Sequence, residues 1–405
     1  MRLAFLCLLI GLNASSQYFL PVARDSVSPL FEIVTYGVAD FGATSIQNDL
    51  TGKFLFGGAI TEEIKNASFD KHKSLNRLGA DVQAELEFRN YKSSLFGKER
   101  LGWLLKGGTY LNAGAVYSDD LFGLAFYGNE RYLGETVSFG GTRGSAWSFR
   151  KIGFGLLDKK TGSSVSLNAY GVASANAADL SVGELYQSAD GDSVYVNYDG
   201  FSENLINKGL FSGWGFGFDV DLRIHVMGYN GSEATVQFLV KNAGLMFLPG
   251  VQRYSADSSF SFTGFTLDQL INSTNLFNST SDLSDTLGIN ADTVSAVRFA
   301  PAFLQVGKMV DEYSSKKMQF FYGARMYPSL VLVPQIYIGL DYRPTKWIAL
   351  GVNGAYGGYT GFRSGLYTDL KLKKMNIGFA SENLIGTMLS TGMGRSLLFR
   401  LNWRI

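Results

Sequence analysis

Apolar and polar residues alternate without interruption in the middle of this chain, from Trp214 to Val226. Every even position there is apolar, and the odd positions carry glycine or polar side chains: Gly215, Gly217, Asp219, Asp221, Arg223 and His225. Successive side chains of a β-strand point to opposite faces, so a period of two predicts a strand with one apolar and one polar face. A helix cannot produce this pattern.

The same alternation recurs along the chain, first from Asp81 to Arg89 and again from Ala234 to Lys241. Less regular candidates cover residues 101–117, 120–128, 146–157, 164–174, 296–309, 317–327, 331–342, 346–356, 361–372 and 374–380. Strands of soluble sandwiches run to about five or six residues, whereas a tilted membrane strand needs about ten. The lengths therefore favour strands that cross a membrane.

The chain ends in the middle of such a pattern. The apolar positions of the last segment are Leu397, Phe399, Leu401, Trp403 and Ile405, alternating with Ser396, Arg400, Asn402 and Arg404. This ending resembles the C-terminal signal of bacterial outer-membrane barrels, although Ile405 replaces their usual terminal aromatic residue. The resemblance implies that the barrel-assembly machinery and outer-membrane lipid are partners of this chain.

Strands in lipid must pair along both edges, because hydrocarbon offers no partner to backbone N–H and C=O groups. We therefore predict an all-β fold, a closed transmembrane antiparallel barrel of about 14 strands, within about two. The 48 glycines, 14% aromatic residues and only seven prolines fit many turns and amphipathic strands.

The N-terminus has the pattern of a signal peptide. Arg2 precedes an apolar run from Leu3 to Leu12, and small or polar residues follow up to Gln17. We expect residues 1–17 to be removed after export and residues 18–405 to form the barrel in the outer membrane of a Gram-negative bacterium. The only cysteine, Cys7, would leave with the signal. A net charge of +1 offers no basic face for nucleic acid.

One long stretch lacks sustained alternation, residues 245–294. Leu267 to Ile271 looks like a short helix, and a polar run follows it. We therefore expect a loop or partly helical insertion here, either a surface loop or cap or a segment folded into the lumen. A second possible helix covers Glu62 to Leu78.

The polar face of the 214–226 strand carries the residues that most resemble a site. Asp219, Asp221, Arg223 and His225 lie two apart, so they form a charged column facing the lumen. They could contact a ligand or ion, or serve as an acid–base pair, or form a salt-bridged network with a purely structural role. The chain has only two histidines, His72 and His225, so a histidine-rich metal site is excluded, and a serine hydrolase would have to use one of the two. The expectation is a protein without cofactor and without enzymatic activity.

Two prolines fall inside predicted strands, Pro301 and Pro334. A proline removes one ladder donor, so each predicts a bulge or a broken pairing. The break could be a harmless bulge near a rim, or a lateral opening from the lumen toward the bilayer.

A family resemblance is carried by Gly217-Phe218-Asp219-Val220-Asp221-Leu222 and, one hairpin later, by Lys241-Asn242-Ala243-Gly244. These runs resemble a motif of Bacteroidota outer-membrane barrels related to the long-chain fatty-acid transporter (FadL-like) superfamily, which includes PorV-like barrels of type IX secretion. Asp221 and Ala243 depart from the usual residues. The resemblance implies an uncharacterised family with 14-stranded barrels and an apolar path in the lumen.

Three functions remain open from the sequence. The first is passage or shuttling of a small hydrophobic molecule, with Pro334 or the 245–294 segment controlling access. The second is a non-transporting scaffold or secretion accessory that anchors a surface or periplasmic partner. The third is an outer-membrane hydrolase using His225 with Asp221 or Asp219.

Overall fold

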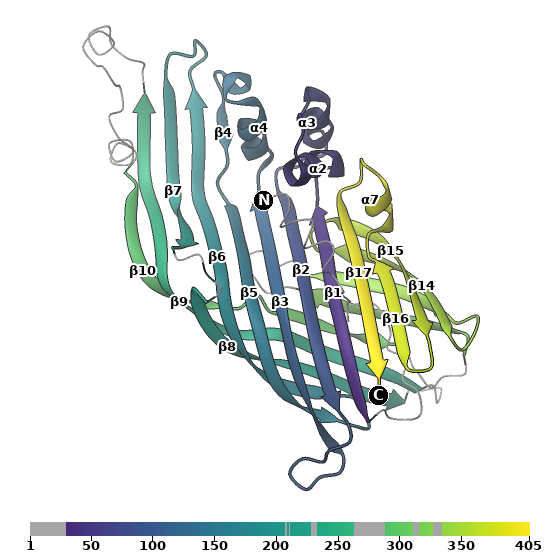
Figure 1. The fold of residues 1–405 in the computed structure, drawn as a ribbon. Helices are drawn as coiled ribbons and strands as arrows, with labels where there is room; N and C mark the ends of the chain where they lie inside the picture. The colour runs from purple at the N-terminus through teal and green to yellow at the C-terminus, as the bar shows by residue number, and fades with distance from the viewer. Residues whose placement is uncertain are drawn as a thin grey trace.

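The computed structural model describes residues 30–206, 209, 211–227, 233–262, 288–310, 316–326 and 334–405. The predicted signal peptide and the predicted helix from Leu267 to Ile271 lie outside these residues. Within them the chain forms one antiparallel sheet that closes on itself (Figure 1). The predicted all-β barrel is confirmed, and it has 14 strand positions.

Seventeen strand segments fill the 14 positions, because three positions are each shared by two segments. The shared positions are β4 with β5, β7 with β8, and β10 with β11. The segments are β1 (Phe31–Ala43), β2 (Asn76–Asn90), β3 (Leu101–Tyr117), β4 (Thr136–Ser138), β5 (Thr142–Asp158), β6 (Ser164–Gln187), β7 (Val194–Leu205), β8 (Gly213–Met227), β9 (Glu233–Phe262), β10 (Asn290–Phe299), β11 (Phe303–Met309), β12 (Met318–Met326), β13 (Gln335–Tyr342), β14 (Ile348–Gly357), β15 (Gly361–Lys371), β16 (Met375–Ser381) and β17 (Gly394–Arg404).

The barrel closes between its first and last strands. β17 pairs with β1 from Gly42↔Gly394 to Glu32↔Arg404, and the backbone of Phe31 and Ile405 exchanges two further hydrogen bonds. We call the end of the barrel that holds Phe31 and Ile405 the near end, and the opposite end the far end. No strand edge is left open at this seam, as a barrel in lipid requires.

The two faces of the wall differ as the alternation predicts. Outward-facing side chains are apolar and exposed, for example Leu167 (74%), Ile338 (61%) and Phe320 (60%). Inward-facing side chains include buried charges such as Glu85, Asp341 and Arg400. An apolar outer surface around a polar interior is the arrangement of a transmembrane barrel and not of a soluble one.

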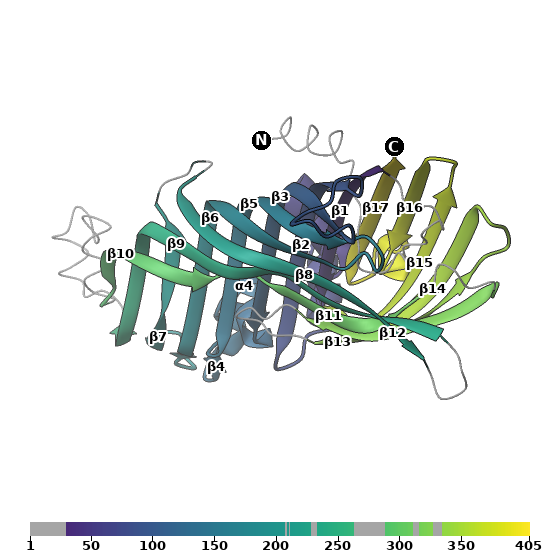
Figure 2. The ribbon, with the colours of Figure 1, turned by 90° about the horizontal axis from the view of Figure 1, so that it is seen from below.

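The barrel is flattened, with an elongated outline when viewed along its axis (Figure 2). β6, β7, β9 and β10 lie at one end of that outline and β14 to β16 at the other. Buried apolar side chains form a separate cluster in each half. One cluster contains Trp147, Phe149 and Met246, and the other contains Phe303, Phe321 and Tyr367.

Short helices gather at the far end (Figure 1): α2 (Asn48–Phe56), α3 (Glu62–Phe69), α4 (Asp119–Tyr127) and α7 (Leu384–Met388). The strand predicted over 120–128 is wrong, because α4 occupies it. Ser118 accepts a hydrogen bond from Leu121 N as the N-cap, and Gly128 ends the helix with φ 76°. Within the described residues, no helix is long and apolar enough to cross a membrane.

Of the insertion predicted over 245–294, residues 245–262 and 290–294 are strand, and residues 263–287 lie outside the described residues. β9 runs on through Phe262, and β10 begins at Asn290. Alternation fails there because β9 shifts register against both neighbours, opposite Phe218/Val220 on β8 and opposite Val294/Ala296 on β10. Each bulge adds a residue to one strand and exchanges its two faces, which removes a simple period of two.

Candidate functional site

The strand position between β6 and β9 is interrupted. β7 pairs with β6 as far as Asn176, and β8 resumes the pairing at Val172, so the intervening residues of β6 have no strand partner on that side. The chain leaves the ladder after Leu205 and rejoins it at Gly213. Next to these two strand ends, Ile206 N donates to Gly250 O and Ser212 N donates to Val172 O.

The strand position on the other side of β9 is interrupted as well, at Pro301. β10 ends at Phe299 and β11 begins at Phe303, while both pair with β9. Ala300 N still donates to Gly244 O, and the buried Pro301 follows without a donor. Pro334 lies elsewhere, exposed and immediately before β13, where a strand loses little by lacking an N–H.

A layer of buried apolar side chains faces the lumen beside these two interruptions. We call it the apolar layer; it consists of Tyr110, Trp147, Phe149, Tyr170, Val172, Ala175, Leu205, Met246, Leu248, Val251, Ala296 and Ala300. Leu205 is the last residue of β7, and Ala300 lies in the gap between β10 and β11. The apolar layer therefore reaches the wall where its strands are broken.

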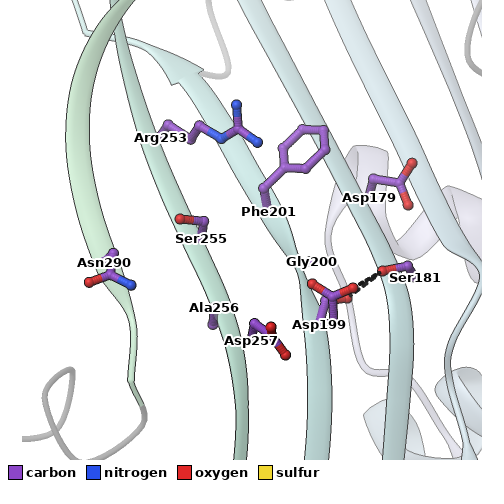
Figure 3. Close-up of a pocket in the computed structure, with 10 residues that line it drawn as sticks. All are labelled: Asp179, Ser181, Asp199, Gly200, Phe201, Arg253, Ser255, Ala256, Asp257 and Asn290. Atoms are coloured by element: carbon purple, nitrogen blue, oxygen red, sulfur yellow. Dashed lines mark hydrogen bonds between the residues drawn. The ribbon is translucent and has the colours of Figure 1, made fainter.

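A polar pocket of about 410 Å³ lies farther along β6, β7 and β9 toward the far end (Figure 3). Its lining residues are Asp179, Ser181, Asp199, Gly200, Phe201, Arg253, Ser255, Ala256, Asp257 and Asn290. Ser181 Oγ donates to Asp199 Oδ2 at 2.6 Å. The guanidinium of Arg253 lies 4.7 Å from the centre of the Phe201 ring.

Glu203 separates this pocket from the apolar layer. The carboxylate is buried and accepts hydrogen bonds from Arg298 Nη2 at 2.7 Å to each oxygen, with Arg253 Nη1 at 3.7 Å. The lining thus changes from polar to apolar along β7, from Asp199 through Glu203 to Leu205.

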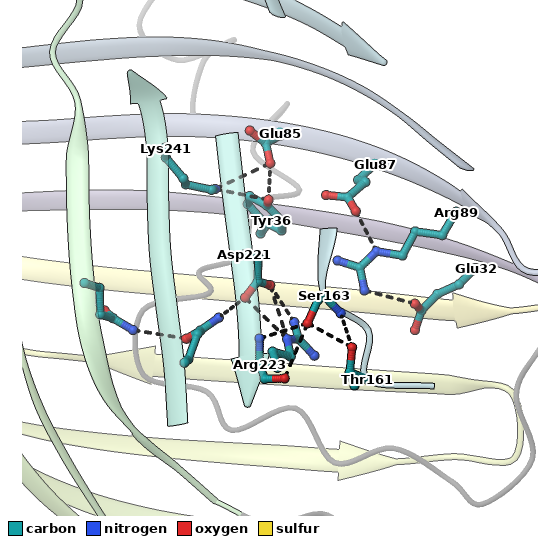
Figure 4. A network of polar contacts seen from close by, with 12 residues as sticks. Glu32, Tyr36, Glu85, Glu87, Arg89, Thr161, Ser163, Asp221, Arg223 and Lys241 are labelled. Atoms are coloured by element: carbon teal, nitrogen blue, oxygen red, sulfur yellow. Dashed lines mark hydrogen bonds and ion pairs between the residues drawn. The ribbon is translucent and has the colours of Figure 1, made fainter. Parts of the chain in front are cut away.

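An ionic seam crosses the lumen at mid-height; its members are Tyr36, Glu85, Lys106, Tyr110, Lys151, Asp219 and Lys241. Figure 4 shows three of them, Tyr36, Glu85 and Lys241. Lys151 Nζ lies 2.8 Å from both Glu85 Oε2 and Asp219 Oδ2. Lys241 on β9 contacts Tyr36 on β1 and Glu85 on β2, although neither strand is its sheet neighbour. Opposite walls of the barrel are therefore joined by side chains at this level.

The predicted charged column is divided among three surroundings. Asp219 belongs to the ionic seam, where Lys106, Lys151 and Asn168 donate to it. Asp221 is held by Arg223 and by Gln237 Nε2 at 2.7 Å. His225 is exposed toward the near end, and its Nδ1 lies 3.0 Å from Thr235 Oγ1. These contacts give no support to an acid–base pair of His225 with either aspartate.

Most of the ionic seam lies outside that column. Glu85 stood in the predicted alternating segment from Asp81 to Arg89, so its inward direction was readable from sequence. Lys106, Lys151 and Lys241 come from three other strands, and only the register of the closed barrel brings them together. In the part of the chain that the structure describes, no group of three or more His, Cys, Asp or Glu residues could hold a metal ion.

Comparisons with known proteins add two kinds of result. Among solved structures, the Pseudomonas putida toluene transporter TodX aligns with a TM-score of 0.35 and 12% identity over 92% of this chain and 87% of that one. A TodX mutant described as a monoaromatic hydrocarbon channel gives 0.39 and 11% over 97% and 92%. The transport unit of the Escherichia coli autotransporter AIDA-I gives 0.24 and 8% over 96% and 94%. Scores this low carry no functional inference.

Sequence comparison is more decisive about family. No curated protein matches the chain. A family profile matches residues 44–382, which include every strand from β2 to β16 and most of the lumen lining described above. The chain belongs to DUF5723, a family of unknown function.

Proposed function

We propose that this barrel lies in the outer membrane of a Gram-negative bacterium and passes a small hydrophobic solute. The apolar outward face and the closed hydrogen-bonded wall support the membrane location. The pattern of an N-terminal signal peptide supports export.

One observation carries the choice of solute: the apolar layer reaches both interrupted strand positions. A hydrophobic molecule could contact Leu205, Met246 and Leu248 without meeting an unpaired charge. The ionic seam bars the direct way to the near end, so the solute would leave sideways at the gap beside Pro301. At that gap β10 has ended and β11 has not begun, and Pro301 has no backbone N–H to donate to a neighbouring strand.

Uptake of a labelled fatty acid into proteoliposomes tests the proposal. We expect the wild-type barrel to raise uptake above that of protein-free liposomes. A Leu205→Asn variant should lose most of this increase, because it places a polar amide in the apolar layer beside the gap. The matched control is Leu398→Asn, an equally buried leucine in the other half of the barrel, which should keep the uptake.

Equal uptake with and without the wild-type protein would overturn the proposal. Heat-modifiable migration in gels verifies that each variant has formed a closed barrel. Loss of uptake in both leucine variants, with both barrels intact, would count against a route through the apolar layer.

A second candidate function is a scaffold that anchors a protein partner at the far end. It is favoured by three consecutive apolar side chains on α2 that stay exposed: Phe54 (60%), Leu55 (56%) and Phe56 (62%). Exposed aromatic residues of this kind are common in protein interfaces. Affinity capture from detergent extracts should return a partner with the wild type and lose it with Phe54→Ser/Phe56→Ser. Return of the barrel alone in both would remove this candidate.

A further inference from the structure

Four buried polar residues face the lumen on three neighbouring strands, in the half of the barrel toward the near end. They are Asp369 on β15, Asn376 on β16, and Arg400 and Asn402 on β17, each no more than 3% exposed. Register places them in two rows: Asp369 and Arg400 flank Gly378, and Asn376 lies directly opposite Asn402. We call them the polar quartet.

Several polar atoms of the quartet have no hydrogen-bond partner among the described residues. These atoms are Nδ2 of Asn376, Oδ1 of Asn402 and both carboxylate oxygens of Asp369. Arg400 Nη2 lies 3.0 Å from Asp369 Oδ1, which is close enough for an ion pair. Two opposed amides thus present a donor and an acceptor that do not satisfy one another.

The ionic seam and the carboxylate of Glu382 are different. In the ionic seam Glu85 contacts Lys151, Lys241, Tyr36 and Tyr110, and Asp219 accepts from two lysines and an asparagine. At the far end, the carboxylate of Glu382 accepts two hydrogen bonds from the guanidinium of Arg325. Buried polar groups without partners are rare in folded proteins because they are costly. Among the buried side-chain atoms without a partner in the described residues, those of Asp369, Asn376 and Asn402 lie together on three adjacent strands, and such a group calls for a partner from outside the chain.

The surroundings decide how such a partner could reach the quartet. One pleat farther toward the far end lie Val38, Tyr367, Ala380 and Leu398, all buried members of one apolar cluster. One pleat toward the near end lie Arg404 and Glu32, of which Arg404 is 12% exposed. A polar molecule could therefore enter from the near end and would be stopped by the apolar cluster.

The charges decide which molecules suit the site. Asp369 and Arg400 neutralise each other, so the quartet has no net charge to attract an ion. Asn376 offers a donor, while Asn402 and Asp369 offer acceptors. A small neutral molecule with hydroxyl groups satisfies both kinds at once.

We infer that the polar quartet is a binding site for small neutral hydroxylic molecules, either ordered water or a short polyol. Such a molecule bridges Asn376 Nδ2 to Asn402 Oδ1 and donates to Asp369. The site is separate from the apolar layer, across the ionic seam, and it takes a ligand of opposite character to the proposed hydrophobic solute. It does not depend on that proposal.

The sign of a stability change tests the inference. Asn376→Leu/Asn402→Leu replaces both amides with apolar groups of similar shape. If the amides are bridged by a bound hydroxylic molecule, the double variant loses those hydrogen bonds, and its melting temperature falls below that of the wild type. If no molecule is bound and the amides have no hydrogen-bond partner, the leucines remove the cost of burying them, and the melting temperature rises. That result would overturn the inference.

Asn168→Leu is the matched control. The buried amide of Asn168 donates to Asp219 at 2.8 Å, so this variant loses a hydrogen bond and its melting temperature falls whether or not the quartet binds a molecule. Added glycerol separates the two ligands. A larger rise in melting temperature for the wild type than for the double variant identifies a polyol site, and an equal rise identifies water. Should the double variant fail to fold, density within hydrogen-bond reach of Asn376 in a structure near 2 Å resolution decides, and its absence there overturns the inference.

Discussion

Lys241 on β9 places its ammonium nitrogen 3.4 Å from Glu85 on β2, across the lumen from its own wall. The same nitrogen lies 3.1 Å from the hydroxyl of Tyr36 and 4.3 Å from the centre of that ring. β9 is separated from β1 and β2 by several strand positions in either direction around the barrel. The contact therefore holds two opposite walls together and keeps the barrel flat.

We expect Lys241→Met to loosen this closure. Removing one partner from a buried ion pair costs about 3–5 kcal/mol when the other charge is left alone. Glu85 keeps Lys151 at 2.8 Å, so we expect a smaller loss of about 1–3 kcal/mol in the free energy of unfolding. Liposome swelling in a small sugar should be faster with the variant than with the wild type.

Arg100→Met is the control for Lys241→Met. Arg100 forms an ion pair with Asp158 at 2.7 Å, but its side chain is 60% exposed at the near end. Neither stability nor swelling should change with this substitution. Swelling that is equal in all three proteins would show that the Lys241 contact does not close the lumen.

Tyr359, which lies between β14 and β15, packs against Gly79 on β2 and Gly114 on β3. A Cβ atom added at Gly79 would lie 2.4 Å from three atoms of the Tyr359 ring, which is too close for any real contact. Gly79→Ala should therefore displace the buried Tyr359 and lower the free energy of unfolding by about 1–3 kcal/mol. Urea titration followed by gel migration measures the change.

Gly52 provides the contrast, since a Cβ there meets nothing within 4 Å. It lies inside α2, where glycine is a poor helix former, so Gly52→Ala should be neutral or stabilising by up to about 1 kcal/mol. Equal effects of the two alanines would refute the packing argument for Tyr359.

Strand positions were readable from sequence wherever one face meets lipid and the other the lumen. The segment predicted over 101–117 coincides with β3, and 361–372 differs from β15 by one residue. β7 was missed because it lies beyond the apolar belt and does not alternate: half-buried Asn197 and Asp199 lie on one face, and half-buried Tyr198 and Gly200 on the other. β1 was missed because its inward face carries Val34, Tyr36 and Val38, so apolar residues occupy both sides.

The candidate site was less predictable than the fold. The column of Asp219, Asp221 and Arg223 was placed by strand period alone, and that period extends only along one strand. The partners of Asp219 come from β3, β5 and β6, and their meeting depends on the shear of the closed sheet and on its flattening. Neither the shear nor the flattening can be predicted from a local sequence pattern.

Helices α3 and α4 form a cap at the far end of the barrel, and His72 makes this cap sensitive to pH. Its Nδ1 donates to Ser68 O at 2.9 Å, its Nε2 faces the Tyr117 hydroxyl at 3.2 Å, and its ring packs on Phe122. Burial lowers the pKa of His72 from its usual 6.5, against smaller opposing effects of Ser68 and Asp119. On acidification the unfolded cap takes up the proton before the folded one, so stability is full above pH 6.5 and falls as the pH drops below it.

Hydrogen exchange over residues 62–72 measures this effect. Relative to intrinsic rates, exchange should be faster at pH 5 than at pH 8 in the wild type. A His72→Gln variant should show little difference between the two pH values. A wild type whose protection is the same at both would rule out His72 as the titrating group.

Asn48 ties α2 to the loop that contains α7. β16 ends at Ser381 while β15 and β17 continue, and α7 lies against both of them beyond that point. The buried Asn48 Nδ2 donates to the carbonyl oxygens of Gly386 and Leu389, and its Oδ1 accepts from Gly394 N at 3.0 Å. One side chain therefore satisfies backbone groups inside the short helix and in the segment that follows it.

Asn48→Leu should leave these buried backbone groups without partners and cost about 1–3 kcal/mol locally. Because α7 has only five residues, we expect the loss to release it as a unit and expose residues 384–394 to protease. Limited proteolysis of the barrel in detergent should cut the variant within this segment many times faster than the wild type. Asn66→Leu is the matched control, since Asn66 accepts only an exposed hydrogen bond from Tyr127, and its cleavage rate should stay at the wild-type value. Equal cleavage of all three proteins would mean that α7 is held by its contacts with β15 and β17 and not by Asn48.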